Sequence, residues 1–531
     1  MNLNIHHEVP DGYYGKLADA WLSGDEELQK LYPVTESEIP HICRQYSQFD
    51  ESGREILFQA LTQQYEGIDV HPNVAANLQK LRERNSFTVT TGQQIHIFLG
   101  PAFFIYKIAS VIRHARRLQA RFPDKNFIPV FWMATEDHDV AEISSFRVFG
   151  KSYNWVAPEG VPTGRLSTQG LEQLSELWIE MGRKENVPAD ILDIFQLFKT
   201  AYSRFSTLSS ATRFIINALF GKYGLLVIDP DQVHLKSGLK SLAAHDLLSD
   251  VVYNGLQNTS NELKQLGYGN QVNPRKRHFF LLNNGLRQRI DKDAEGFKLH
   301  PSGEAIPVEK MSELLQHTPE SFSPNALLRP LYQQLILPNV AYVCGPSEIH
   351  YWHQLHAVFK QENVVAPLLF LRDSYVILDE KNRHFLDKNA LTQNTIWQGF
   401  EVSSQVLERN ILGTIHIDDE IGALKQINER IFKTLFELKY KDIKALRVKS
   451  DSWIKDLDKA RKEVINEVRS QPAFESEFRK LQKIINTYFN KKNPQEREIS
   501  WIEILLKFSH NPTDLLVENT DLNHVFGMIC V

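Results

Sequence analysis

The chain has 531 residues, 42% of them hydrophobic and 24% charged, with a formal net charge of −5 at pH 7. This is the composition of a soluble globular protein, and because no basic block stands out, it indicates neither nucleic-acid nor membrane-surface binding. The longest apolar runs are far shorter than the roughly 20 residues of a membrane span, and the opening residues lack the pattern of a secretion signal. We therefore expect a cytoplasmic protein of about two or three structural units.

The residues that commonly hold metal ions are poorly placed to do so. The three cysteines, Cys43, Cys344 and Cys530, are too far apart in sequence for a short zinc-binding spacing, and each is expected to be a small buried hydrophobe. His350, His353 and His356 recur on one face of a predicted helix, yet no acidic ligand stands at a suitable offset. We expect no metal site built from these residues.

Residues 1–85 have helical periodicity and predict an N-terminal helical segment. The pattern changes at Ser86, where a short β-branched run predicts a buried strand. A glycine-containing loop follows, and Pro101 suits the first turn of a long helix. A second apolar strand is predicted at 127–135. The order strand, helix, strand favours a right-handed parallel crossover.

Further strands are predicted at 224–228, 341–344 and 364–371, with a helix at 349–359 between the last two. Two insertions, about 150–220 and 240–325, separate these core pieces. The first is helix-rich, and the second contains a predicted hairpin at Asn283-Asn284-Gly285. The pattern indicates an α/β fold, a doubly wound parallel sheet spanning 86–385.

From about 415 to 490 the chain is poor in Gly and Pro and rich in Lys, Glu, Leu and Ile, which predicts a helical arm within residues 386–500. Its seven-residue spacings favour a coiled coil that is antiparallel or forms a dimer, and the alternative is an ordinary pair of amphipathic surface helices. These spacings join Leu424, Ile431, Leu438 and Ala445, then Trp453, Ala460 and Glu467, with Leu457 and Val464 on a second seam. The final segment, 501–531, is expected to pack back on the core.

The loop 92–100 follows the carboxyl end of the first core strand and precedes a helix. A doubly wound sheet places its ligand at this position, and free N–H groups with the helix dipole favour an anion there. The alternative is a tight turn without a ligand. The loop matches neither the dinucleotide fingerprint nor the P-loop.

The second core strand ends in Glu136, Asp137, His138 and Asp139. Such crowding of carboxylates is unfavourable unless a cation, an ammonium group or solvent relieves it. The options are a magnesium-phosphate contact, an amine site, or acid–base work by His138. The alternative is a solvated loop that caps a helix beginning near Val140. Because both strand ends face one crevice, we favour a functional site.

A third strand-to-helix junction, Gly345-Pro346-Ser347-Glu348, is predicted at the same edge of the sheet. Ser347 or Glu348 can cap the helix or contact a ligand. Arg329, upstream of a proline, suits bidentate recognition of phosphate or carboxylate, and a surface salt bridge is the alternative.

Four segments together resemble the cysteine-adding enzymes of bacillithiol biosynthesis. They agree in order and spacing, and the resemblance covers most of the chain. They are TGQQIHIFLGPAFFIYK (91–107), PVFWMATEDHD (129–139), SPNALLRPLYQQLILPNVAYVCGPSEIHYW (323–352) and NPQER (493–497).

The resemblance implies a Rossmann-like core related to class I aminoacyl-tRNA synthetases and mycothiol cysteine ligase. It also implies two connecting insertions and a helical coiled-coil domain used for homodimerisation. The implied reaction is the last step of the pathway, an amide bond between the carboxyl group of cysteine and the amine of glucosaminyl-malate. Since direct condensation in water is unfavourable, ATP is implied as the activator, with Mg²⁺ left open.

The resemblance also implies site residues, which fall into three groups. The catalytic acidic rim is Glu136, Asp137, His138 and Asp139. The substrate-binding cleft comprises Gly92, Gln93, Gln94, Gly100, Pro101, Lys107, Arg329, Gly345, Pro346 and Glu348, with Tyr106 in support. The nucleotide phosphates are assigned to Lys492, Gln495 and Arg497, with Glu496 beside them.

The sequence departs from the family pattern at His96, Cys344 and Ser347, where the resemblance implies small residues. We therefore assign no catalytic role to His96 and no nucleophilic role to Cys344. A lysine-rich KMSKS-like loop is absent, which leaves acyl-adenylate and acyl-phosphate activation both open. Two alternatives to a ligase stand: a nucleotide-binding scaffold of the same pathway, and a nucleotidyltransferase acting on another small acid.

Overall fold

The computed structural model describes residues 3–6, 12–32, 35–46, 49, 51–412, 417–518 and 526–530. The chain divides into two compact units. The first comprises Met1–Val376, Glu496–Ile529 and Val531, and the second comprises Ile377–Gln495 and Cys530. The domain boundaries predicted from the sequence stay a prediction, and residues 519–525 and 531 of the predicted C-terminal segment lie outside the described residues.

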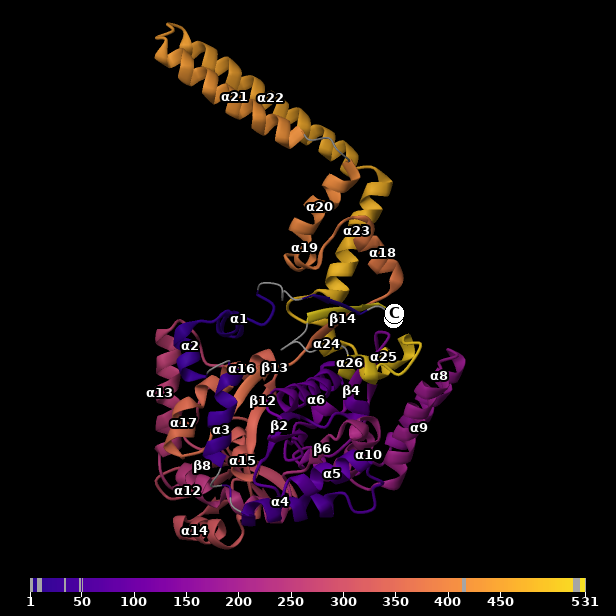
Figure 1. Cartoon of the computed structure of the whole chain (residues 1–531), viewed down its shortest axis with the longest axis vertical. Coiled ribbons are helices and arrows are strands. Elements are labelled where there is room, and N and C mark those ends of the chain that lie inside the picture. The colour runs from indigo at the N-terminus through magenta and orange to yellow at the C-terminus, as the bar shows by residue number, and fades with distance from the viewer. Residues whose placement is uncertain are drawn as a thin grey trace. The chain divides into compact units, whose positions relative to one another are not determined.

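A five-stranded parallel sheet forms the centre of the first unit (Figure 1). Its strands lie in the order β13-β12-β2-β3-β6, so the order reverses between β2 and β12. This is the doubly wound order of Rossmann-like folds, and the predicted fold class is confirmed. The bounds are β2 Ser86–Gln93, β3 Asn126–Met133, β6 Leu226–Ile228, β12 Asn339–Cys344 and β13 Leu368–Leu371.

The central strands are buried on both faces, as their continuous apolar and β-branched sequences predict. β2 and β3 pair in register from Ser86 opposite Asn126 to Gln93 opposite Met133. The crossover helix α6 (Phe103–Arg121) connects them and buries most of its side chains against the sheet.

Helix α6 begins two residues after Pro101, so the prediction that this proline lies in its first turn is wrong. The preceding residues are instead paired with the chain near Ser500: Pro101 bridges Ser500, and Trp501 N–H donates to Gly100 O at 2.9 Å. Gly100 has φ 56°, and an added Cβ would lie 2.5 Å from Cβ of His96. Glycine is therefore required at this junction.

The first insertion contains the hairpin β4 (Ser145–Val148) and β5 (Lys151–Asn154) and three helices, α8 (Leu171–Lys184), α9 (Ala189–Arg204) and α10 (Leu208–Phe220). The second carries helices α12 (Lys240–Leu248), α13 (Val251–Gln265) and α14 (Val308–His317) and an antiparallel sheet in the order β10-β9-β8-β7-β11. Asn283 pairs with Leu286, which confirms the predicted hairpin. The strands are β7 Phe279–Asn283, β8 Leu286–Lys292, β9 Phe297–His300, β10 Ala305–Ile306 and β11 Phe322–Pro324.

The remaining helices of the first unit surround this core. Helix α15 (Arg329–Ile336) precedes β12, and α16 (Pro346–Gln354) and α17 (His356–Gln361) connect β12 to β13. The N-terminal helices are α1 Lys16–Leu22, α2 Glu26–Leu31, α3 Ile39–Gln45, α4 Glu51–Gln64 and α5 Pro72–Lys80. Near the C-terminus lie α25 (Trp501–Lys507) and α26 (Thr513–Glu518), and β15 (Phe526–Cys530) pairs antiparallel with β1 (Leu3–His6).

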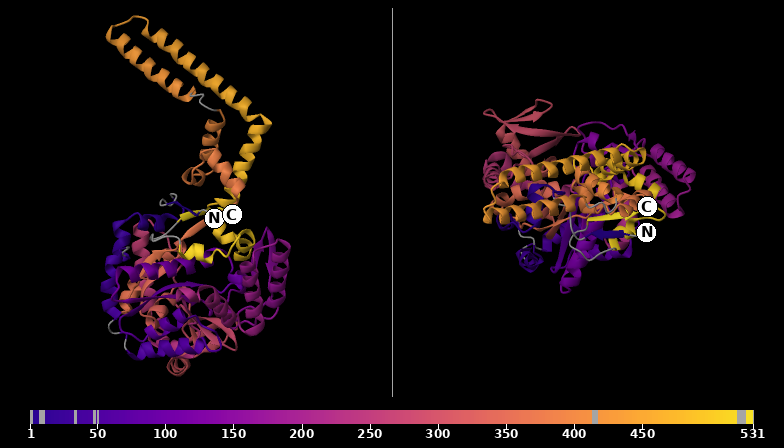
Figure 2. Two further views of the ribbon diagram at one scale, coloured as in Figure 1. Left: turned by 45° about the vertical axis from the view of Figure 1, so that its right-hand side comes forward. Right: turned by 90° about the horizontal axis from the view of Figure 1, so that it is seen from above.

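The second unit is helical, and α21 (Ile417–Glu437) and α22 (Ile443–Arg469) run antiparallel side by side (Figures 1 and 2). Their buried side chains include Ile421, Phe432 and Ile454. The predicted seam residue Ile431 is 50% exposed, and Leu438 is 72% exposed. The helical arm is thus present, whereas a coiled coil and a homodimer stay predictions.

The other helices of this unit are α18 Glu380–Lys388, α19 Gln393–Trp397, α20 Phe400–Leu412 and α23 Pro472–Tyr488, and α20 packs on α23. Throughout the described part of both units, no helix combines the length and apolar character that crossing a membrane requires.

The ion pair of Arg372 with Glu496 provides a stability test for the first unit. The two side chains are 2% and 3% exposed and share two hydrogen bonds, of 2.8 and 2.5 Å. Glu496→Gln leaves a buried guanidinium without its counter-charge, and we expect the free energy of unfolding to fall by about 3–5 kcal/mol in urea titrations. Glu55→Gln, which breaks the exposed pair with Arg82, is the control and should cost less than about 1 kcal/mol. Equal losses would contradict the prediction.

Candidate active site

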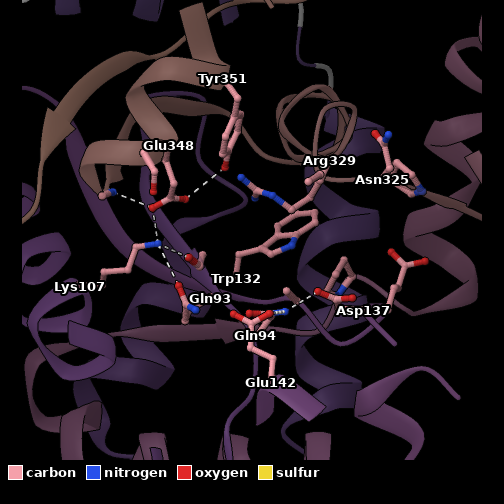
Figure 3. Close-up of a pocket in the computed structure, with 18 of the residues that line it drawn as sticks. Gln93, Gln94, Lys107, Trp132, Asp137, Glu142, Asn325, Arg329, Glu348 and Tyr351 are labelled. Atoms are coloured by element: carbon pink, nitrogen blue, oxygen red, sulfur yellow. Dashed lines mark hydrogen bonds and ion pairs between the residues drawn. The ribbon is translucent and has the colours of Figure 1, made fainter. Parts of the chain in front are cut away.

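A cavity of about 540 Å³ opens at the carboxyl ends of the parallel strands, where the strand order reverses. Its walls come from the loops after β2, β3 and β12, from α6 and α15, and from the second insertion (Figure 3). All lining residues belong to the first unit. Ligands of doubly wound folds bind at this switch point, and the volume suits small molecules.

The structure brings most of the sequence-predicted site residues to this cavity. Those that line it are Gly92, Gln93, Gln94, Lys107, Glu136, Asp137, His138, Arg329, Gly345, Glu348 and Arg497. Gly100, Pro101, Asp139 and Pro346 do not line it. Lys492 and Gln495 belong to the second unit, where Gln495 is buried and hydrogen-bonded to the main chain of Ile377.

A buried ion pair joins the two sides of the switch point. Lys107 Nζ, on α6, lies 2.5 Å from Glu348 Oε2 and donates to Gly92 O at 2.6 Å. Glu348 also accepts from Gly345 N–H at 2.6 Å and from Tyr342 Oη at 2.8 Å. Burial opposes ionisation, but Lys107 and these donors outweigh it and lower the pKa of Glu348. This wall is therefore internally neutralised.

Arg329 differs because its charge has no carboxylate partner. Its guanidinium donates to Gln333 Oε1 at 2.9 Å and Tyr342 Oη at 3.2 Å and lies over the ring of Trp132. Within the described ranges no Asp or Glu forms an ion pair with it. Gly92 permits this approach, since an added Cβ would lie 3.3 Å from Nη1. The arginine can therefore bind a carboxylate or phosphate.

Carboxylates gather on another wall of the cavity. Gln94 Nε2 donates to Asp137 Oδ2 at 2.6 Å and to Glu142 Oε2 at 2.7 Å, so one amide joins both (Figure 3). Asp139 instead caps the short helix α7 (Val140–Ile143) by accepting from Glu142 N–H. The alternative that this loop caps a helix is therefore correct for Asp139, whereas Asp137 lines the cavity. This wall can hold an ammonium group or sugar hydroxyls.

The charge of Glu136 is neutralised by a series of connected ion pairs. Lys236 Nζ lies 2.7 Å from Glu136 Oε1 and 2.9 Å from Asp231 Oδ1, and Arg165 makes two hydrogen bonds to Asp231. Burial raises the pKa of Glu136. It also opposes the charge of Lys236, but the two carboxylates prevail and raise the pKa of that lysine. Lysine and arginine side chains therefore relieve the crowding that the sequence indicated.

His138 contacts the second insertion. Arg287 Nη1, on β8, lies 3.0 Å from His138 Nδ1, and the same guanidinium donates to Ser323 Oγ at 3.0 Å and Pro324 O at 2.7 Å. Phe280 lies beneath it, with the guanidinium 4.0 Å from the ring centre. Burial and then Arg287 lower the pKa of His138.

Several N–H groups in the loop 92–100 and just after it form hydrogen bonds within the protein. Gly100 N–H donates to Ile97 O, Phe98 N–H to Tyr202 Oη, and Ala102 N–H to Ile499 O. These three N–H groups are therefore not free to bind an anion, and an anion site in this loop stays a prediction. His96, also in the loop, is buried and does not line the cavity.

Several cavity residues were missed from the sequence, namely Trp132, Glu142, Arg287, Tyr342, Tyr351 and Arg372. The strand-end rule that singled out Glu136 could also have found Arg372, which directly follows β13. Arg287 carries no comparable signal, because it lies in an insertion strand remote from the core motifs.

The strand order and the cavity at its reversal define a Rossmann-like ligand-binding protein. Residues 4–373 match a family model described as "Bacillithiol biosynthesis BshC, N-terminal Rossmann-like domain". The chain therefore belongs to the BshC family of bacillithiol biosynthesis.

Full-length relatives agree with this assignment. Proteins named "Putative cysteine ligase BshC" from Flavobacterium johnsoniae and Christiangramia forsetii are each 32% identical, over 96% of this chain and 95% of theirs. A protein of the same name from Flavobacterium psychrophilum is 33% identical over 93% of both chains. The resemblance seen in the sequence is confirmed, and the names support a ligase at the coarse level.

His96 gives the loop a testable pH dependence. Burial lowers its pKa to about 4, whereas an unfolded histidine titrates near about 6.5. The unfolded chain therefore takes up the proton first, and stability falls as pH drops through this window. Between about pH 7.5 and about pH 5 we expect His96 to account for about 2 kcal/mol of lost stability.

His96→Leu should remove this component, measured as the difference between the wild-type and variant free energies of unfolding across that pH range. Parallel pH curves for the two proteins would contradict the prediction.

Proposed function

We propose that the chain is a carbon–nitrogen ligase that joins the carboxyl group of cysteine to the amine of glucosaminyl-malate. In this proposal ATP activates the carboxyl group, and the reaction is the last step of bacillithiol biosynthesis in the cytoplasm. The observation that carries the proposal is one cavity with two separate features: the guanidinium of Arg329, which forms no ion pair with a carboxylate of the described residues, and a cluster of carboxylates at Asp137 and Glu142.

The two walls match the charges of the proposed substrates. Glucosaminyl-malate carries carboxylates at one end and an amine at the other, and nucleotide phosphates add negative charge. Arg329 and the exposed Arg497 supply positive charge for the anionic groups. Asp137 and Glu142 supply acceptors for an ammonium group and for hydroxyls. One cavity can therefore align both substrates, which accounts for a large part of the rate in such reactions.

The proposal needs no protein nucleophile. ATP converts the carboxylate into an acyl-phosphate with release of ADP, or into an acyl-adenylate with release of pyrophosphate. The ammonium group loses a proton to water, the free amine attacks the acyl carbon, phosphate or AMP leaves, and the nitrogen loses its second proton to water or to that leaving group. The protein then has to stabilise charge and exclude water. Cys344 is unsuited to covalent catalysis, because it is fully buried with its Sγ directed at Phe370 O, and burial raises the pKa of its thiol.

The nucleotide and metal assignments rest on the resemblance and on general chemistry. Of the proposed nucleotide residues, Arg497 lines the cavity. Asp137 and Glu142 present oxygen atoms of the kind that Mg²⁺ prefers. Across the described segments no group of three or more His, Cys, Asp or Glu side chains is arranged to hold a metal ion. Any Mg²⁺ in the reaction would accordingly be bound largely by nucleotide phosphates.

Reconstitution tests the function directly. Purified protein with ATP, Mg²⁺, cysteine and glucosaminyl-malate should yield bacillithiol, detected by mass spectrometry. Calorimetry should show that glucosaminyl-malate binds the wild type and binds Arg329→Gln about 100-fold more weakly, as expected when a buried charge pair loses one partner. Nucleotide binding with neither substrate binding nor product would instead indicate a scaffold. Pyrophosphate release with a different acid alone would indicate a nucleotidyltransferase.

Neighbouring aspartates provide a matched test of the acidic wall. Asp137→Asn removes a charge that faces the cavity, and we expect kcat/KM to fall about 100-fold because the substrate ammonium loses its counter-charge. Asp139→Asn changes a carboxylate that caps α7 and does not line the cavity, and asparagine caps equally well, so this control should stay near wild-type activity. Equal activities of the two variants would refute the role of Asp137.

A further inference from the structure

We propose that His138 acts as a neutral hydrogen-bond donor through Nε2–H, and that Arg287 is the positioning residue that holds the ring in this tautomer. The inference deepens the proposed ligase function and rests on it for the identity of the acceptor. It assigns to His138 a fixed donor role in place of the acid–base role that its residue type suggests.

The first step is the identity of the donor between the two side chains. Arginine has five N–H groups and no acceptor. At the 3.0 Å contact, Arg287 Nη1 therefore donates, and His138 Nδ1 accepts through its lone pair. A neutral imidazole with a free Nδ1 carries its proton on Nε2. The contact thus selects one of the two neutral tautomers.

The second step is that Arg287 cannot readily turn away. Its Nε and Nη2 donate to Ser323 Oγ and Pro324 O, both on β11, and its flat face rests on Phe280. The residue is 8% exposed. Because three separate contacts orient the guanidinium, its Nη1–H stays directed at the imidazole.

The third step is that a proton taken up by the neutral ring, which has its free lone pair at Nδ1, would be disfavoured. The resulting imidazolium would carry Nδ1–H as well, which would face an N–H group of a second cation at 3.0 Å. Asp137 Oδ1, 3.8 Å from Nδ1, and Asp139 favour the charged ring. Burial and Arg287 outweigh these carboxylates and lower the pKa of the imidazole. General-base action by His138 is therefore opposed, because Nε2 already carries a proton and the surroundings of the ring disfavour a second one at Nδ1.

The remaining ring nitrogen is available to a ligand. His138 lines the cavity with its side chain 35% exposed. No protein hydrogen bond to Nε2 is formed from the parts of the chain that the structure describes. A donor beside Asp137 and facing the cavity suits the oxygen that gains negative charge when the amine attacks the activated acyl group. The proton remains on Nε2 throughout, so no bond to His138 forms or breaks.

Glutamine at position 138 separates donation from proton transfer. Its side-chain amide can place an N–H near the position of Nε2 but does not titrate. We expect His138→Gln to keep kcat within about 10-fold of wild type, whereas His138→Ala, which lacks the donor, should lose about 10²–10³-fold. Equal loss in both folded variants, with an active wild type, would overturn the proposal. An inactive wild type would count against the ligase function alone.

A second measurement tests the tautomer without any activity. In protein with ¹⁵N-labelled histidine, the ring signals of His138 are identified by their absence from His138→Gln. The wild type should show a protonated Nε2 and an unprotonated Nδ1, and a protonated Nδ1 near neutral pH would overturn the proposal.

Variants of Arg287 complete the test. Arg287→Lys keeps a group that can only donate, and it should preserve the wild-type tautomer. Arg287→Met removes the donor and the charge, so the second tautomer should appear and His138 should titrate at a higher pH. Unchanged His138 spectra and titration in folded Arg287→Met would show that Arg287 does not position the ring.

Discussion

The ion pair between Lys107 and Glu348 crosses the point at which the order of the parallel strands reverses. Lysine comes from the helix that follows β2, and glutamate comes from the helix that follows β12. Through their hydrogen bonds to Gly92 and Gly345, the pair ties together two loops that diverge from adjacent strands. A buried pair is favourable only when its remaining hydrogen-bonding groups are satisfied, and here the tyrosines and main-chain groups around it meet that need. The ion pair therefore links the two loops at this wall of the cavity.

Charges around the cavity fall into two kinds. Glu136 with Lys236, and Arg372 with Glu496, are neutralised inside the protein and support the walls. Arg329 retains binding capacity, because its partners are an amide and a hydroxyl instead of a carboxylate. Desolvated charge without a counter-ion is costly, and a bound anion would remove this cost. The anionic groups of the proposed substrates match this arginine, and the proposed reaction requires no protein nucleophile.

Both insertions contribute to the candidate active site at the end of the parallel sheet. In the first, Thr163 N–H and Gly164 N–H donate to the carbonyls of Asp137 and Thr135 at 2.6 and 2.8 Å, which fixes the main chain of the acidic loop. The second supplies Arg287, whose contact with Nδ1 determines what His138 can do. The core sheet therefore gathers the reactive groups, and the insertions set their orientation and protonation.

The sequence by itself determined the doubly wound class, the hairpin at Asn283–Gly285 and the clustering of Gln94, Asp137, Arg329 and Glu348, because strand ends of a parallel sheet share one edge. Family membership also followed from its linked motifs. Only the tertiary structure decided that Asp139 caps a helix, that Gly100 and Pro101 pair with the chain near Ser500, and that Arg287 reaches His138. These outcomes depend mainly on contacts between residues far apart in the chain. The local spacing of residues does not indicate which distant side chain will contact them in the folded protein. Whether a charge is neutralised or left for a ligand is decided by those contacts alone.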